Sequence, residues 1–353
     1  CLLPPASCLL RACFLGCGEE DCGEMVERES LGKAGLSACA RWFRAAEATG
    51  EFLGIRYGRM SEGSDEMEWL YVPHVECDGI GGFARLLREK GAVLPSLPVT
   101  NHPDRRVIRP LLNLFRKRRP VGKLAVRADW FQDGGSAGRV SKAVAWKVFS
   151  EEETERIRQK CRREGVTVNS FLLKGLDGAV RPDTREPGAA IPWMIPVNLR
   201  GDVTHADDTE NHVSSVDVYV SPDDTVNEIQ RGMRECLERG EHRANHLILC
   251  MGKHLSHRAK LWCVRKSGDE PKGNIGAFSN LGVWDAEKTM APDTWLFCPP
   301  VCNVQLLGAG CVTFQNRLSL MIQGHVGLSE RPEMVVGWME RWVESLRSSG
   351  KVC

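Results

Sequence analysis

The spacing of apolar and polar positions divides the chain into short strands and amphipathic helices. Residues 69–72 are a run of aromatic and β-branched side chains, which predicts a strand. Pro73 has no backbone N–H to donate to a neighbouring strand, so the strand is expected to end there. From Ile80 onward, apolar residues recur at helical spacing as far as Gly91, which predicts a helix. The residues between Pro73 and Ile80 are therefore expected to form a strand-to-helix loop.

Segments with the pattern of a strand and segments with the spacing of a helix recur on either side of this unit. Ser150 and Glu153 have the spacing of a capping box and predict the start of a helix, and Thr225 and Glu228 repeat that pattern. The remaining predicted elements are helices over 36–46, 150–163, 167–180, 225–250, 254–266 and 333–346, and strands over 52–57, 143–149, 191–199, 213–220, 273–284, 295–298, 303–307, 311–314 and 318–323.

Strands and helices occur in both halves of the chain, which is typical of a mixed α/β fold with two lobes. The pattern breaks over residues 94–122, where five prolines punctuate the sequence. We therefore predict an N-terminal lobe over residues 1–140 and a C-terminal lobe over residues 141–353.

Composition narrows the class of protein. Among 353 residues, 42% are hydrophobic and 26% charged, which are the values of a globular protein with a full core. The formal net charge of +1 argues against a general nucleic-acid binder. No run of about 18 apolar residues occurs, so no membrane-spanning helix is expected. The fifteen cysteines are odd in number and favour free thiols in a reducing, cytoplasmic setting. Residues 1–18 lack a basic leader and are expected to be folded chain rather than a signal peptide.

One stretch has a strong local charge. Arg116, Lys117, Arg118 and Arg119 follow an apolar run that begins at Leu111. Apolar residues beside a basic cluster can make a peripheral membrane contact or bind a phosphorylated ligand. The alternative is a solvated basic loop between the lobes.

His74 and Asp78 are the candidate chemical groups of the predicted loop. A histidine and a carboxylate four residues apart can form a base with an orienting partner, and they can equally be a structural histidine beside a turn aspartate. Pro73 and Gly79 make this loop a poor helix, which disfavours a metal site. His242, His246 and Cys250 have metal-ligand spacing on a predicted helix, but no fourth ligand is evident and a helix surface or lobe contact is favoured. No metal is predicted.

The segment Pro73-His74-Val75-Glu76-Cys77-Asp78-Gly79 resembles the His-His-x-x-x-Asp-Gly signature of the chloramphenicol acetyltransferase-like acyltransferases. This superfamily includes condensation domains of nonribosomal peptide synthetases, plant alcohol acyltransferases and wax ester synthase/diacylglycerol acyltransferases. Pro73 replaces the first histidine of the signature, and His74 corresponds to the catalytic one.

Further segments resemble the family in the same order along the chain. Residues 195–200, Ile-Pro-Val-Asn-Leu-Arg, are similar to its Pro-Val-x-x-Arg strand, and residues 150–180 are similar to the start of its second lobe. Residues 211–215, residues 278–282 and the final strand–helix pair follow. The resemblance covers most of the chain from about residue 50. The Asp-Phe-Gly-Trp-Gly motif of the plant branch is absent, which disfavours that branch.

The resemblance implies two lobes with a channel between them and an acyl transfer from a CoA or carrier-protein thioester to a hydroxyl or amine, with a hydroxyl favoured. His74 would act as general base, and Asp78 would hold the loop by pairing with Arg200. Ser279 and Asn280 are candidate donors to the developing oxyanion, although a turn that satisfies its own backbone explains them equally well. Gly79 and Arg200 are expected on the substrate-binding side of the loop. Acyl-CoA would be a co-substrate, with no bound cofactor.

Three alternatives stay open. A condensation-type domain would form amides on a carrier protein. A catalytically inactive member of the family would act as a binding or scaffold protein, which the replacement at Pro73 keeps in view. A lipid acceptor at a membrane surface would use the segment from Leu111 to Arg119.

Overall fold

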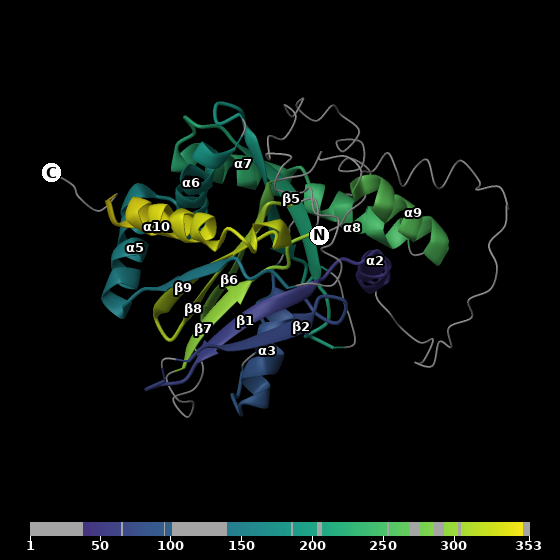
Figure 1. Cartoon of the computed structure of the whole chain (residues 1–353), viewed down its shortest axis with the longest axis horizontal. Helices are drawn as coiled ribbons and strands as arrows, with labels where there is room; N and C mark the ends of the chain where they lie inside the picture. The colour runs from purple at the N-terminus through teal and green to yellow at the C-terminus, as the bar shows by residue number, and fades with distance from the viewer. Residues whose placement is uncertain are drawn as a thin grey trace.

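The computed structural model describes residues 38–64, 66–94, 96–100, 140–184, 186–202, 207–252, 254–268, 275–285, 293–302 and 305–348. Within these residues the strands form two sheets, one of three strands and one of six, and helices flank both (Figure 1). The larger sheet contains both parallel and antiparallel pairs. The predicted mixed α/β fold class is confirmed.

The smaller sheet carries the strand that leads into the His74 loop. Its order is β2-β1-β7, and β1 (Gly54–Met60) pairs antiparallel with both β2 (Glu68–Pro73) and β7 (Thr294–Cys298). The helix α3 (Gly79–Glu89) follows β2 and packs against this sheet (Figure 1). Strand, loop and helix therefore follow one another as the sequence predicted.

A strand from late in the chain completes the smaller sheet. Because β7 pairs with β1, this sheet combines segments from before and after residue 140. Its core also combines them, since the ring of Phe83 on α3 packs edge-on against Trp284, Trp295 and Phe314. The lobe boundary at residue 140 stays a prediction. The smaller sheet takes strands from both sides of that boundary.

The larger sheet has the order β3-β9-β8-β6-β4-β5. β6 lies parallel to β4 and β8, and the other pairs are antiparallel. Its strands are β3 (Val144–Val148), β4 (Ile191–Asn198), β5 (Val213–Val220), β6 (Gly276–Trp284), β8 (Leu307–Phe314) and β9 (Arg317–Gly324).

Apolar helix faces cover the larger sheet and form the main core. The two predicted capping boxes are present, because Ser150 and Thr225 each exchange hydrogen bonds with the glutamate three residues on. The helices are α2 (Ala38–Glu47), α5 (Glu151–Glu164), α6 (Val168–Val180), α7 (Val226–Glu238), α8 (Glu241–Gly252), α9 (His257–Gly268) and α10 (Pro332–Ser348), with short 3-10 turns at Arg181–Asp183 and Val326–Leu328.

Two predicted elements were wrong in their continuity. The single helix over 225–250 is two helices, α7 and α8, because Gly240 adopts a positive φ of 70° between them. The strand predicted over 311–314 begins four residues earlier, at Leu307, as β8; of the separate strand predicted over 303–307, only Leu307 belongs to a strand, and residues 303–304 lie outside the described residues. Gly310 within β8 is not a break: a Cβ there would lie 2.1 Å from the carbonyl oxygen of Phe297, so glycine lets β7 cross closely over β8.

Candidate functional site

The His74 loop joins β2 to α3 through a tight turn. The backbone N–H of His74 donates to the carbonyl of Leu53 at 3.0 Å, which fixes the loop to the segment before β1. Asp78 is the N-cap of α3, and its Oδ1 accepts from the backbone N–H of Gly81 at 2.8 Å. The carboxylate thus satisfies one of the free N–H groups at the helix start. The helix begins at Gly79, one residue before the predicted start.

Asp78 also forms the predicted ion pair with Arg200. The guanidinium makes a two-pronged contact with the carboxylate, at 2.8 Å from Nη1 to Oδ2 and 3.0 Å from Nη2 to Oδ1. Both residues are buried, and the backbone N–H of His212 donates to Oδ2 at 2.8 Å. Bidentate geometry and an additional donor are the conditions under which a buried pair offsets its desolvation. The predicted Asp78–Arg200 contact is confirmed.

Arg200 is itself held by the loop that follows β4. Its Nε donates to the carbonyl of Asp208 at 2.9 Å, and its Nη2 donates to the carbonyl of Glu210 at 3.2 Å. The ion pair therefore fastens the start of α3 to the connection between β4 and β5. This explains how a residue 122 positions away along the chain reaches the His74 loop.

The imidazole of His74 has a defined tautomer. Its Nδ1 lies 2.9 Å from the carbonyl oxygen of Cys77, and that oxygen can only accept, so Nδ1 must carry the hydrogen. The lone pair is then on Nε2, and no hydrogen bond engages Nε2 among the residues that the structure describes. Nε2 is the nitrogen that can accept a proton.

Two residues that the sequence analysis did not select hold the imidazole in place. The side-chain amide of Asn211 donates to the carbonyl of His74 at 2.9 Å and lies 3.3 Å from Nδ1. The ring of Phe43, from α2, stacks on the imidazole with 4.3 Å between centroids. Asn211 begins one of the family-like segments, and that position was its only signal in the sequence. Nothing in the sequence pattern indicates the contact of Phe43.

Burial sets the charge of this histidine. His74 is 7% exposed, and burial lowers its pKa from 6.5 to about 4, although the hydrogen bond to Cys77 and the charge of Asp78 oppose that shift. The imidazole is therefore neutral at pH 7. Burial likewise raises the pKa of the adjacent Cys77 thiol to about 12, so that thiol stays protonated near neutral pH.

Ser279 and Asn280, the predicted oxyanion donors, lie on β6 rather than in the His74 loop. Ser279 is buried, and neither it nor Asn280 forms a hydrogen bond with the imidazole in the described part of the chain. Asn280 uses its Oδ1 to accept from the backbone N–H of Gly282 at 2.8 Å, at a β-bulge. The alternative prediction, a turn that satisfies its own backbone, describes Asn280.

Gly79 is enclosed by packing. A Cβ there would lie 2.9 Å from the ring of Phe297 and 3.0 Å from the side chain of Leu281, so β7 and β6 both press on the start of α3. Its carbonyl oxygen accepts from the hydroxyl of Tyr57 at 2.8 Å. The structure therefore supports a packing role for Gly79, and its substrate-binding role stays a prediction.

The other candidate histidines belong to α8. The carbonyl of His242, a buried residue, accepts from the hydroxyl of Ser214 at 2.6 Å, which is a contact between α8 and β5. His246 Nε2 lies 3.4 Å from the Sγ of Cys250. Within the ranges that the structure describes, no group of three His, Cys, Asp or Glu side chains could hold a metal ion.

Two further predictions concern contact with a membrane. The basic segment from Leu111 to Arg119 lies outside the described residues, so its contact with a membrane stays a prediction. In the part of the chain that is described, no helix has both the length and the apolar character needed to cross a bilayer.

Comparisons with known proteins detect similarity through structure rather than sequence. No protein-family model matches the chain, and no curated protein matches it. The chain is similar to the cyclization–docking bidomain of the EpoB nonribosomal peptide synthetase from Sorangium cellulosum, with a TM-score of 0.52 and 12% identity over 82% of this chain and 61% of that one.

Two other solved structures are similar at a lower score. They are the first condensation domain of the calcium-dependent antibiotic synthetase, with a TM-score of 0.49 and 14% identity over 85% of this chain and 67% of that one, and the polyketide synthase associated protein 5 from Mycobacterium tuberculosis, with 0.47 and 13% over 82% and 75%. Together with its antiparallel three-stranded sheet and mixed six-stranded sheet, the likeness to the EpoB bidomain shows that this chain has the two-lobed α/β fold of that bidomain.

Proposed function

We propose that the protein is an acyltransferase that moves an acyl group from a thioester to a hydroxyl or amine acceptor, with His74 as the general base. The observation that carries this proposal is the state of the imidazole: neutral, with Nδ1 fixed as a donor to Cys77 and the lone pair on Nε2. A base must be deprotonated and correctly oriented before its substrate arrives. Burial meets the first condition and the contact at Nδ1 meets the second.

The proposed reaction proceeds in two steps. The acceptor oxygen or nitrogen attacks the thioester carbonyl while Nε2 of His74 takes its proton, which gives a tetrahedral oxyanion and an imidazolium. The oxyanion then collapses, the C–S bond breaks, and the imidazolium returns the proton to the departing thiolate. The products are an ester or amide and a free thiol, and the imidazole is again neutral.

Residues around His74 fit this route better than a route through a covalent intermediate. Cys77 is next to the imidazole, but its thiol is protonated because burial raises its pKa to about 12. Direct transfer with His74 as base is therefore the favoured route. Asp78 and Arg200, which face each other, position the loop and are not expected to touch the acyl group. Ser279 remains a candidate donor to the oxyanion.

The donor and the acceptor are proposed as chemical classes rather than as individual compounds. A thioester on CoA and a thioester on a carrier protein present the same acyl carbonyl and the same thiol leaving group, so the chemistry at His74 accommodates both. Acyl-CoA serves as co-substrate in the first case, and a carrier protein is a partner in the second. The preferred acceptor is a hydroxyl, on a small molecule or a lipid, with amide formation of the condensation type as the variant reaction.

The test measures thiol release from purified protein. Wild-type protein is incubated with a panel of acyl-CoA donors and hydroxyl or amine acceptors, and free thiol is followed with a chromogenic disulfide. His74→Gln should reduce turnover by about 10²-fold or more, since a general base contributes a factor of that order. His257→Gln, which changes an exposed histidine on α9, should leave turnover unchanged. Equal turnover in the wild type and in His74→Gln would exclude His74 as the base.

A second candidate function is binding without catalysis. The specific observation in its favour is that Phe43 stacks on an imidazole that is only 7% exposed, which closes one face of the base. A binding protein would bind the acyl thioester in calorimetry and release no thiol with any acceptor. Thiol release that depends on His74 would exclude it.

A further inference from the structure

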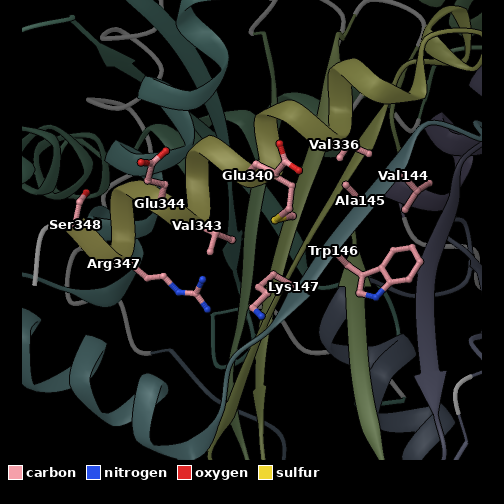
Figure 2. Close-up of a pocket in the computed structure, with 11 residues that line it drawn as sticks. Val144, Ala145, Trp146, Lys147, Val336, Glu340, Val343, Glu344, Arg347 and Ser348 are labelled. Atoms are coloured by element: carbon pink, nitrogen blue, oxygen red, sulfur yellow. The ribbon is translucent and has the colours of Figure 1, made fainter.

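A groove of about 840 Å³ lies between β3 and α10 (Figure 2), and its lining residues do not include any of the His74 loop. Two large apolar side chains on its walls are unusually open to solvent: Trp146 is 44% exposed and Val336 is 42% exposed. Figure 2 shows Trp146 toward one end of the groove and Arg347 toward the other. The remaining lining residues are Val144, Ala145, Lys147, Met339, Glu340, Val343, Glu344 and Ser348.

The groove follows the free edge of β3. Consecutive residues of a strand point to opposite faces of a sheet, yet residues 144–147 all line this one cavity. A cavity that touches four consecutive residues must run along the edge of the strand. In the described sheet β3 is an end strand that pairs only with β9. An open edge between apolar side chains is a template for another strand.

The charges of the groove are of both signs. Lys147 projects from β3, and Glu340 and Glu344 lie one turn apart on the exposed face of α10. Within the described residues none of the three forms a salt bridge, although the charge of Lys147 helps to lower the pKa of Glu153, whose salt bridge is with the fourth charged residue of the groove, Arg347. A fatty-acid carboxylate would match Lys147 and face the two glutamates, whereas a basic peptide would match the glutamates and face Lys147. An occupant that matches all three side chains therefore carries both positive and negative charges.

We propose that the groove is a self-association surface, in which β3 pairs antiparallel with β3 of a second copy of this chain. A two-fold axis presents the same patch on both sides, so each copy offers the lysine and the glutamates that the other requires. Ala145 packs in the core with Trp338 of α10, so Lys147, two residues on, shares that face. A pair centred on Trp146 therefore places Lys147 opposite Ala145 of the second copy, beneath its α10, and covers the exposed indole.

Sedimentation equilibrium of the purified full chain tests this proposal. The wild type should form dimers in a concentration-dependent manner. Lys147→Glu replaces the lysine opposite the glutamates of the second copy by a third carboxylate, so it should raise the dimer dissociation constant by about tenfold or more. Lys142→Glu introduces the same charge change at an exposed residue outside the groove and should leave the constant unchanged. A wild type that is monomeric at every concentration would overturn the proposal.

Charge reversal of the whole groove provides the stricter test. The triple variant Lys147→Glu, Glu340→Lys, Glu344→Lys restores opposite signs and should recover the dimer that Lys147→Glu loses. Should the triple variant not fold, hydrogen exchange of wild-type protein supplies the result: the amides of residues 144–148 should be protected at high concentration and open at low concentration. Exchange there that is independent of concentration would refute the pairing. The outcome does not depend on acyl transfer.

Discussion

His74 receives its chemical state from three neighbours. The carbonyl of Cys77 fixes its tautomer, the amide of Asn211 ties its backbone, and the ring of Phe43 covers one face. Each contact comes from a different segment of the chain. The imidazole that we propose as the base is thus held in place before any substrate binds, which is the condition for proximity to contribute to catalysis.

Asn211 is expected to act as a positioning residue. Asn211→Ala removes the hydrogen bond to the carbonyl of His74 and should lower kcat by up to about 10²-fold with a small effect on KM, because misplacing a catalytic group slows the chemical step more than binding. Steady-state kinetics of acyl transfer measure the split. The matched control is Asn245→Ala, which removes an equivalent bond to the carbonyl of Ser215, and it should leave kcat unchanged. A rise in KM alone would contradict the positioning role.

The buried imidazole should make stability depend on pH in a defined direction. The folded pKa of His74 is about 4 and the unfolded value is 6.5, so between these values the unfolded chain binds a proton that the folded chain does not. The contribution to stability is therefore complete above pH 6.5 and is lost as the pH falls toward 4. Its size is on the order of 3 kcal/mol.

Urea unfolding of the wild type and of His74→Gln between pH 7 and pH 4 measures this contribution. The free energy of unfolding should fall less steeply in His74→Gln, while His257→Gln should follow the wild type. Identical slopes in the wild type and in His74→Gln would show that the histidine titrates normally in the folded protein.

At the scale of elements, the start of α3 is the most constrained position. A Cβ on Gly81 would lie 2.0 Å from the carbonyl oxygen of Thr209, a backbone atom that cannot move aside as a side chain can. The helix therefore begins where the connection between β4 and β5 presses against it. This contact and the Asp78 cap together fix the direction of α3 relative to β2.

Gly81→Ala and Gly178→Ala are a matched pair of helical glycine substitutions. Gly81→Ala should destabilise the protein by about 1–3 kcal/mol because of the overpacked contact. Gly178, on α6, has open space around a Cβ, so Gly178→Ala should be neutral or stabilise by up to about 1 kcal/mol through helix propensity. Thermal and urea unfolding measure both. Equal effects of the two substitutions would contradict the close contact at Gly81.

At the scale of the whole molecule, the connections between the two halves of the chain include a strand pairing and an ion pair. β7 leaves the second half of the chain to pair with β1, and the Asp78–Arg200 pair joins the loop after β2 to the end of β4. The candidate site lies at the second connection. Its geometry therefore depends on both halves of the chain.

Removing one partner of the Asp78–Arg200 ion pair should lower the free energy of unfolding by several kcal/mol. Asp78→Asn or Arg200→Ala leaves a buried group without its partner and should each lower the free energy of unfolding by about 3–5 kcal/mol, with the double variant well short of the sum. The control is Arg88→Ala, which breaks a solvent-exposed pair with Asp208 and should cost at most about 1 kcal/mol. Additive losses in the double-mutant cycle would show that Asp78 and Arg200 act independently.

The sequence by itself determined the local elements and the identity of the central pair. Aromatic and β-branched residues with a terminal Pro73 specify β2, helical periodicity specifies α3, and the family signature pointed to His74, Asp78 and its partner Arg200. These features are local in the chain, or are carried by a motif, so they can be read without the fold.

Only the tertiary structure decided which distant segments meet. Gly240 and Gly310 are both single glycines in the sequence, and only the structure distinguishes them: Gly240 adopts a positive φ and ends α7, whereas Gly310 stays in β8 and lets Phe297 approach. Asn211 and Phe43 reach the imidazole from different segments of the chain, and burial in the fold lowers its pKa. Contacts between segments far apart in sequence have no period that the sequence could show, which is the physical reason they were found only in the fold.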